Sequence, residues 1–269
     1  TVTQSLLINA PGVTDATNVS ALLTYAANRT DCFVIVDPAY QDVADEMTTA
    51  ASYLQTSYGA AYYPNIIIAD PTTQAPGATR SIAPGGAVAA AYVGTDASRG
   101  VFKAPAGIQT VLQGVVALES SLSSSDLDSL NSATQPVNAI RQIPGAGLSV
   151  MGARTLLQDG TANRYVNMRR SLNYIEAKLN NITQFAIFEN NDENLWSRIR
   201  TTINVFLNDY RNKGGLRGAT AAQAYFILCD ATNNTPTTIA NGEVHIQVGV
   251  ALQYPAEFIV IDLSQKTIV

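Results

Sequence analysis

The sequence predicts an α/β fold in which a parallel layer of strands and helices comes first and a smaller α+β module follows. Residues 1–70 alternate strand, helix, strand, helix and strand, an order typical of a parallel sheet covered by helices. Residues 151–217 carry two amphipathic helices whose polar faces are basic. A chain of 269 residues is long enough for one large domain or two ordinary ones.

The elements of the first layer follow from short apolar runs bounded by polar residues. Residues 31–37 read DCFVIVD, a continuous apolar run typical of a strand that is buried on both faces. Flanking strands are expected at residues 5–11 and 65–69, with helices at 18–28 and 43–56 between the strands. The pattern starts abruptly and without an initiator Met, so we expect a fragment of a longer protein, with further strands of this sheet before it.

The middle of the chain mixes loops with shorter elements. By composition, residues 71–84 are a loop, and the Pro-Gly-Gly at its end opens an Ala-rich helix whose small side chains allow close packing on a sheet. Strands are expected at 110–118, 137–143 and 148–151, and a short helix at 126–131.

Two helices define the module that follows. Their apolar residues recur at spacings of three and four, which places them on one face of each helix. Asn190 and Glu193 have the spacing of a capping box at the start of the second helix. Between the helices, Phe185 and Ile187 predict a short buried strand. The two apolar faces consist of Tyr165, Met168, Leu172, Ile175 and Leu179, and of Trp196, Ile199, Ile203, Phe206 and Tyr210.

Three strands are expected after the module, at residues 224–229, 243–252 and 256–263. The last strand follows a break at Tyr254-Pro255. Both of its faces are apolar, so we expect it to be buried on both sides, because a long apolar strand at an open edge invites aggregation. The residues on these two faces are Phe258, Ile259, Val260, Ile261 and Leu263.

Charge is distributed unevenly along the chain. The net charge is −5, from 16 basic and 21 acidic residues. Residues 141–217 hold eleven of the basic and six of the acidic residues, so this segment carries +5 and the remainder −10. Charged residues make up 14% of the chain, against roughly 25% in typical soluble domains. An uncharged polar surface is typical of a protein that is partly covered by partners. A protein whose polar surface is simply exposed to solvent would have the same composition.

Motifs for catalysis, cofactor binding and metal binding are absent, so no catalytic, cofactor-binding or metal-ligating residue is assigned. His245 is the only histidine, and strand alternation places it on a polar face with Glu243 and Gln247. Cys32 and Cys229 lie in apolar runs and are expected to act as small hydrophobic residues, not as a disulfide or a metal site. No Gly-x-Ser-x-Gly and no phosphate-binding Gly-rich loop occurs, and no apolar run reaches the roughly 18 residues of a membrane span.

Charged pairs in the sequence have simpler explanations than a site. Asp37 and Asp70 end two of the strands expected to be parallel, the edge at which α/β active sites form. Each precedes a Pro, so a structural stop is the preferred interpretation. Arg169 and Arg170 could bind phosphate or nucleic acid, but the acidity of the whole chain and the absence of interleaved aromatic residues favour a protein contact or a solvated face.

The chain also contains longer segments that are informative together: YGAAYYPNIIIADP (58–71), PGGAVAAAYVGTDASRGVFKAPAG (84–107), IRQIPGAGLSVMGARTL (140–156), NRYVNMRRSLNYIEAKL (163–179), FENNDENLWSRIRTTINVFL (188–207), GLRGATAAQAYFILCDATNNTP (215–236) and GEVHIQVGVALQYPAEFIVI (242–261). In this order, these segments resemble the C-terminal part of contractile tail sheath proteins. That family occurs in contractile phage tails, R-type bacteriocins and related injection machines. The resemblance extends over roughly residues 20–265 and is specific, because several segments are ten or more residues long.

The resemblance implies a fold and a mechanical role. It implies a subtilisin-like α/β domain over residues 1–145, incomplete at its N-terminus, and a C-terminal α+β domain over residues 146–269. Sheath subunits form six-fold rings that stack around an inner tube, and contraction drives the tube through the target envelope without consuming nucleotide. The implied protein is not an enzyme and needs no cofactor. The alternatives are a hydrolase-like α/β enzyme without a recognisable motif and a binding module of another assembly.

The same resemblance implies partners and a location. The partners are further copies of this chain, the inner tube protein, and the baseplate and tail terminator proteins, with no nucleic acid and no membrane insertion. The location is the tail of a virion or contractile particle that is assembled in the bacterial host cytoplasm.

Two sets of residues are assigned by combining the residue pattern with this resemblance. Residues 256–266 are expected to pair with a sheet of an adjacent subunit, the alternative being that they complete their own sheet. The basic residues on and just after the second helix are expected to face an acidic tube surface, the alternative being a solvated face. These candidates for tube contact are Arg198, Arg200, Arg211, Lys213 and Arg217.

Overall fold

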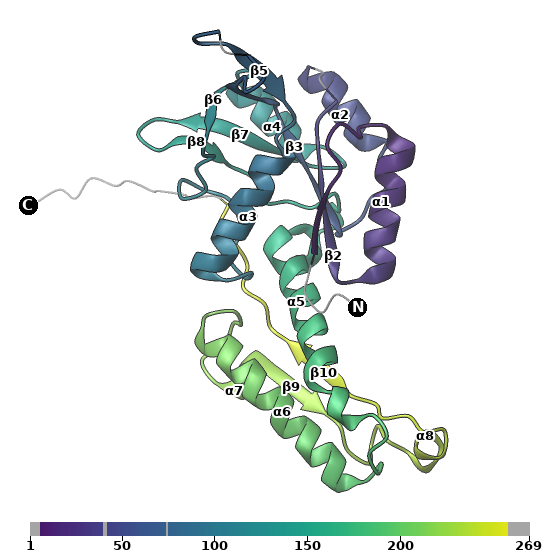
Figure 1. The fold of residues 1–269 in the computed structure, drawn as a ribbon. Helices are drawn as coiled ribbons and strands as arrows, with labels where there is room; N and C mark the ends of the chain where they lie inside the picture. Colours follow the sequence, from purple (N-terminus) through teal and green to yellow (C-terminus); the bar gives the residue numbers. More distant parts are fainter. Residues whose placement is uncertain (1–5, 40–41, 74, 258–269) are drawn as a thin grey trace, which may run out of the picture.

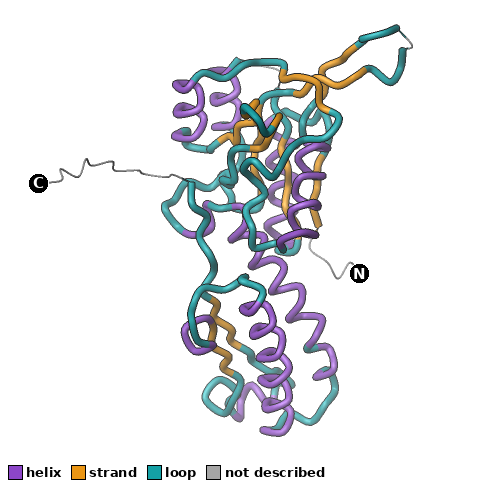
Figure 2. Tube along the Cα trace, turned by 90° about the vertical axis from the view of Figure 1, so that its left-hand side faces the viewer, coloured by secondary structure: helices purple, strands orange, loops and turns teal. Residues whose placement is uncertain are grey.

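A sheet layer (residues 6–156) and a helical module (residues 166–252) are joined end to end, the layer in the upper half of Figure 1 and the module in the lower half. The long helix α5 (Val166–Ile182) starts beside the sheet and runs down into the module, so the molecule is elongated in both views (Figures 1 and 2). This computed structural model describes residues 6–39, 42–73 and 75–257.

Five strands form the central sheet: β1 (Leu6–Asn9), β2 (Cys32–Val36), β3 (Gly59–Tyr63), β7 (Val137–Ile143) and β8 (Gly147–Val150). Their order is β1-β2-β3-β7-β8, with the first four parallel to one another and β8 antiparallel to β7. The predicted α/β class and the buried strand within residues 31–37 are therefore confirmed. The third parallel strand is β3 (residues 59–63), so the prediction that residues 65–69 supply this strand is wrong.

Four helices cover the two faces of this sheet: α1 (Ala16–Arg29), α2 (Val43–Ala51), α3 (Gly85–Arg99) and α4 (Ser124–Ser132). The sequence predicts all four, although α2 ends five residues earlier than expected. The side chains of Asp15, Asp42 and Ser123 cap α1, α2 and α4 by accepting a hydrogen bond from a backbone N–H of the first turn.

Each face of the sheet has its own hydrophobic core. Helices α1, α2 and α4 pack on one face, and α3 packs on the other together with the first turn of α5. Strand β2 contributes to both cores, because Cys32 faces α1 whereas Phe33 faces α3. Gly59 at the start of β3 allows close packing on the first face, since a Cβ there would lie 2.3 Å from Leu23 Cδ2.

A second, antiparallel sheet lies beside the first and consists of β4 (Ile66–Ala69), β5 (Thr79–Ile82) and β6 (Val115–Leu118). Its order is β5-β4-β6. Residues 65–69 thus supply a strand to this sheet instead of to the parallel one, and the predicted loop 71–84 contains β5. Only the last part of the strand predicted at 110–118 is a strand, namely β6. Before it, Val111 forms a single isolated β-bridge with Ser149.

The helical module is built from α5, α6 (Glu193–Asn212), α7 (Ala221–Ala224), β9 (Tyr225–Leu228), α8 (Pro236–Ala240) and β10 (Gln247–Val250). Strands β9 and β10 pair antiparallel and are shorter than predicted. The module's core lies between this sheet and the two long helices, and it contains Ile175, Trp196 and Ile203 from the predicted apolar faces. The amphipathic pattern of both helices is therefore confirmed.

Two local predictions at the α5–α6 connection are wrong. The connection contains the short 3₁₀ helix η2 (Gln184–Ala186) and no strand. A second short 3₁₀ helix, η1 (Ala162–Arg164), precedes α5. Ile187 is 64% exposed, whereas Phe185 is partly buried against the core of the helical module. The α6 N-cap is Asp192, whose carboxylate accepts a hydrogen bond from the Leu195 N–H at 3.0 Å, and not Asn190.

The predicted last strand falls mostly beyond the described part of the chain. Ala256 and Glu257 are described and are not in a strand, whereas the five residues assigned to its faces lie outside the described residues. The two cysteines, Cys32 and Cys229, are buried and unpaired with each other, as expected. Of the helices in the described ranges, none has the length and apolar character that crossing a membrane requires. The strand residues outside the description are Phe258, Ile259, Val260, Ile261 and Leu263.

Candidate assembly surfaces

An ion pair between a buried arginine and a partly exposed aspartate joins the helical module to the sheet layer. Arg170 of α5 is 3% exposed and donates two hydrogen bonds to the Asp96 carboxylate of α3, at 2.9 and 2.5 Å. Its guanidinium lies 4.8 Å from the ring centre of Tyr92, whose hydroxyl is 2.5 Å from that of Tyr62 on β3. The interpretation of Arg170 as a solvated or partner-binding residue is wrong. No local pattern marks it, because its partner Asp96 lies 74 residues away.

The chain returns to the sheet layer after β10 and is held there. The Glu257 carboxylate accepts hydrogen bonds from the Arg154 guanidinium at 2.9 and 2.8 Å. The Tyr165 ring packs edge to face on Tyr254, with ring centres 6.1 Å apart. The Asn167 amide donates to the Gln253 carbonyl at 3.1 Å. These contacts fix where the segment after Glu257 leaves the described part of the molecule, and the sequence prediction missed them. The Arg154–Glu257 bridge, the Tyr165–Tyr254 ring contact and the Asn167–Gln253 hydrogen bond are together called the exit clamp below.

The sheet of the helical module has an edge that no other described strand pairs with. Among the described strands, β9 and β10 pair only with each other, so β10 keeps one edge without a partner strand. Beside β10 lies a groove of about 330 Å³ that is also lined by α5. Ile246, Val248 and Val250 line its sheet side, and Leu172 and Leu179 line its helix side. This surface therefore combines unpaired backbone groups with an apolar groove.

Three of the five basic residues proposed for tube contact are paired with acidic residues of the same module. The Arg200 guanidinium lies 2.5 Å from the Glu193 carboxylate, and the Lys213 ammonium lies 2.7 Å from the Asp209 carboxylate. The third pair is looser: the Arg198 guanidinium lies 4.0 Å from the Glu189 carboxylate, and the Arg198 side chain is 60% exposed. The positive charge on this helix is therefore partly neutralised within the module.

The five basic residues do not form one continuous patch. Arg198 lies over the Phe185 ring, on the side of α6 that faces the α5–α6 connection. Arg200 donates to the Cys229 carbonyl just after β9, and Arg211 donates to the Ala219 carbonyl of the loop before α7 at 3.0 Å. Arg217 and Lys213 are exposed near the end of the helix. Arg217 is exposed and forms no ion pair among the described residues, so its charge is the most available to a partner, followed by that of the loosely paired Arg198.

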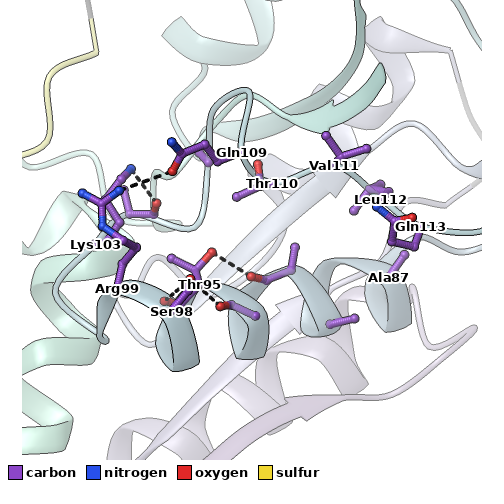
Figure 3. A pocket seen from close by; sticks show the side chains of 15 residues that line it. Ala87, Thr95, Ser98, Arg99, Lys103, Gln109, Thr110, Val111, Leu112 and Gln113 are labelled. Carbon is purple, nitrogen blue, oxygen red and sulfur yellow. Dashed lines mark hydrogen bonds between the residues drawn. The ribbon is translucent and has the colours of Figure 1, made fainter. Parts of the chain in front are cut away.

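A groove runs along the outer face of α3 (Figure 3). Its volume is about 340 Å³, and its two walls are α3 and residues 103–113. Figure 3 shows Arg99 and Lys103 together at one end, and Ala87 and Leu112 at the other. Small side chains of α3 leave the space between the walls open.

Apolar side chains are also presented at the far end of the molecule. Phe188 in the α5–α6 connection is fully exposed, at 104%, and its backbone has φ +67°. Left-handed backbone is uncommon for a bulky residue and costs on the order of 1 kcal/mol. Together with exposed Ile187, Phe188 forms a protruding apolar tip.

Of the titratable groups weighed as catalytic candidates, Asp37 has a structural role and His245 lies on the surface. The Asp37 carboxylate accepts hydrogen bonds from the Gly85 N–H at 2.8 Å and from the Asn9 amide at 3.2 Å, so it holds the start of α3 against the sheet. Burial raises the pKa of Asp37. His245 is exposed with Glu243 and Gln247, as predicted, and its Nε2 lies 2.9 Å from the Glu243 carboxylate. The Asp37 and His245 groups lie in different parts of the molecule.

Comparison with known proteins identifies the family. Residues 158–266 match the model of the phage tail sheath C-terminal domain. The tail sheath protein of Vibrio phage KVP40 is 26% identical over 107 residues, which are 40% of this chain and 15% of that protein. The chain thus matches only a small part of that curated relative's length.

Solved structures match nearly the whole chain. A chain of the anti-feeding prophage baseplate is 30% identical with a TM-score of 0.81, over 97% of this chain and 69% of that one. A chain of the anti-feeding prophage helical sheath in its contracted state is 29% identical with a TM-score of 0.82, over 98% of this chain and 71% of that one. The fold, the family model and these relatives agree with the resemblance drawn from the sequence segments, and the chain belongs to the contractile tail sheath protein family.

Proposed function

We propose that this chain is part of a sheath subunit that polymerises as stacked six-fold rings around an inner tube and contracts to drive the tube through a target envelope. The observation that carries the proposal is the match over 98% of the chain to a helical sheath in the contracted state. The role is mechanical, so the protein acts without catalysis. It works in the tail of a virion or contractile particle that is assembled in the host cytoplasm.

The domain division belongs to this proposal. Residues 1–145 are assigned to the subtilisin-like α/β domain of the subunit, and residues 146–269 to its C-terminal α+β domain. Strand β8 pairs with β7 in the central sheet, so in the structure the sheet layer extends past residue 145. The separate hydrophobic core beneath α5 and α6 supports the division. The ion pair between buried Arg170 and Asp96 supports the further idea that both domains move together, because separating the two would leave the Arg170 guanidinium buried without its carboxylate partner.

Copies of the chain are linked by strand exchange in this proposal. Residues 256–266 of one subunit, including Phe258, Ile259, Val260, Ile261 and Leu263, add a strand to a sheet of the next. The free edge and apolar groove of β10 make it the preferred acceptor, since backbone pairing and burial are both available there. The exit clamp supports the donor role, because it gives the terminal segment a fixed starting point on the sheet layer.

The proposed partners are further copies of the chain, the inner tube protein, and the baseplate and terminator proteins. Baseplate association is supported by the match to a chain of the anti-feeding prophage baseplate. Tube contact is assigned to Arg198, Arg200, Arg211, Lys213 and Arg217. Arg217 and Arg198 are the strongest candidates, because neither is closely paired with a carboxylate in the described part of the chain.

Electron microscopy of the full-length protein tests the proposed function. We expect the purified protein to form ordered tubes or stacked rings at high concentration. Monodisperse, discrete particles under all assembly conditions, with or without tube protein, would contradict the proposal.

A further inference from the structure

The groove beside α3 is lined by small side chains that packing within the chain does not require. Ala87, Ala90 and Gly94 of α3 line it. A Cβ on Gly94 would meet nothing within 4 Å, so packing within the chain does not demand glycine at this position. A glycine inside a helix is less favourable than an alanine. Gly94 therefore keeps this part of the groove open at some cost in helix stability, whereas Ala87 and Ala90 suit the helix.

One end of this groove carries positive charge without a matching carboxylate. Arg99 donates to the Gln109 amide oxygen at 3.4 Å, and the Lys103 ammonium donates to the Ala104 carbonyl at 3.1 Å. Neither side chain forms a salt bridge with a carboxylate in the described parts of the chain. Burial and the neighbouring Arg99 lower the pKa of Lys103, as expected where two cations lie close together. An acidic group from outside would relieve this arrangement.

The apolar tip has the complementary character. Ile187 and Phe188 protrude at 64% and 104% exposure. Glu189 follows at once and is half exposed, and its carboxylate is only loosely paired, at 4.0 Å from the Arg198 guanidinium. Figure 1 places this connection at the lower end of the helical module, away from α3. A single chain therefore leaves the tip outside its own groove.

We propose that the Ile187–Phe188 tip of one copy inserts into the α3 groove of a neighbouring copy, with Glu189 placed near Arg99 and Lys103. This inference rests on the proposed self-assembly. Because tip and groove are different surfaces of the same chain, the contact is head to tail, and such contacts build open helical polymers when they do not close into rings. The charges select the register, and the apolar side chains supply the buried area.

Cysteine cross-linking between copies tests this contact in the full-length protein. One preparation carries Phe188→Cys and a second carries Ala90→Cys, and the two are mixed before assembly and treated with a short bismaleimide. The native Cys32 and Cys229 are buried, and burial raises the pKa of both thiols, so they react poorly. We expect a covalent dimer that contains one copy of each variant.

The matched control is Ala97→Cys, which is exposed on α3 but does not line the groove. Ile187→Cys provides a second tip variant that keeps the Phe188 ring. Assemblies that form normally but give no dimer with either tip variant would overturn the inference, as would equal cross-linking to Ala97→Cys. Cross-linking of the tip to tube protein in place of a second copy would also overturn it. Failure of the unmodified protein to assemble at all would instead contradict the proposed function.

Discussion

Glu46 is a carboxyl group in the interior of the sheet layer, where its side chain is fully buried. One oxygen accepts a hydrogen bond from the Ala39 N–H at 3.1 Å, and the other has no partner among the described residues. Burial raises the pKa of Glu46 to about 7, from 4.5 when it is exposed. The folded state therefore binds this proton more tightly than the unfolded state does.

The stability of the protein should depend on pH through this residue. A raised folded pKa gives a contribution that is present below pH 4.5 and is lost as the pH rises to about 7. Glu46→Gln removes the buried charge and should raise the free energy of unfolding at pH 8 by on the order of 2 kcal/mol. Urea unfolding at pH 5 and pH 8 measures this, with exposed Asp45→Asn of the same helix as the control. An equal effect of Glu46→Gln at both pH values would show that the charge is not responsible.

Residue-scale partners are the least predictable feature of this chain. Sequence periodicity correctly places Ile175 and Trp196 in a core, because burial of apolar residues depends on the local pattern. It assigns Arg170 to a surface, because the pattern cannot report the carboxylate of Asp96 that the fold brings against it. The exit clamp was missed for the same reason, since Arg154 and Glu257 are 103 residues apart.

At the scale of elements, α6 is the element that carries the proposed tube contact. Reversing the charge of Arg198 and Arg200 should weaken co-assembly with the tube, with the largest loss at low salt, because exposed charges are screened within about 10 Å at 0.1 M salt. Arg198→Glu alone should cause much of this loss, since Arg200 is already paired with Glu193.

Co-sedimentation of sheath protein with preformed tubes measures the effect. Arg80→Glu, an exposed reversal on β5, is the control for a change in total charge. Thermal melting of each variant checks that the helical module remains folded. Unchanged co-sedimentation of the double variant at low salt would remove Arg198 and Arg200 from the tube-contact set.

The sequence predicts a helix or strand correctly where its local hydrophobic pattern is strong. It fails where the sheet that a strand joins depends on which distant strand it pairs with. The apolar run at 31–37 fixes β2, and the hairpin around β7 and β8 is also recovered. Residues 65–69 do form a strand, but apolarity alone does not show that β4 joins the antiparallel sheet. The parallel strand β3 was missed because its small residues, such as Gly59 and Ala60, look weak as a strand while they allow helix α1 to pack closely.

The proposed sheath holds together only if neighbouring copies of the chain are linked. The chain presents a free β10 edge and a clamped exit for the terminal segment, which suit an acceptor and a donor on the same subunit. Paired backbones persist while flanking residues bend, so such links can survive a change from a long, narrow sheath to a short, wide one. The segment from residue 256 onward is therefore expected to be essential for sheath integrity and not for folding of the subunit.

Deletion of residues 256–269 from the full-length protein, followed by electron microscopy of assembly and contraction, tests this claim most directly. Glu257→Gln, which weakens the clamp but keeps the terminal segment, separates loss of the ion pair from loss of the strand. We predict that the deletion variant folds with an unchanged circular dichroism spectrum and forms no continuous sheaths, whereas Glu257→Gln still forms them. A deletion variant that builds normal sheaths, which then contract without falling apart, would contradict strand donation as the link between subunits.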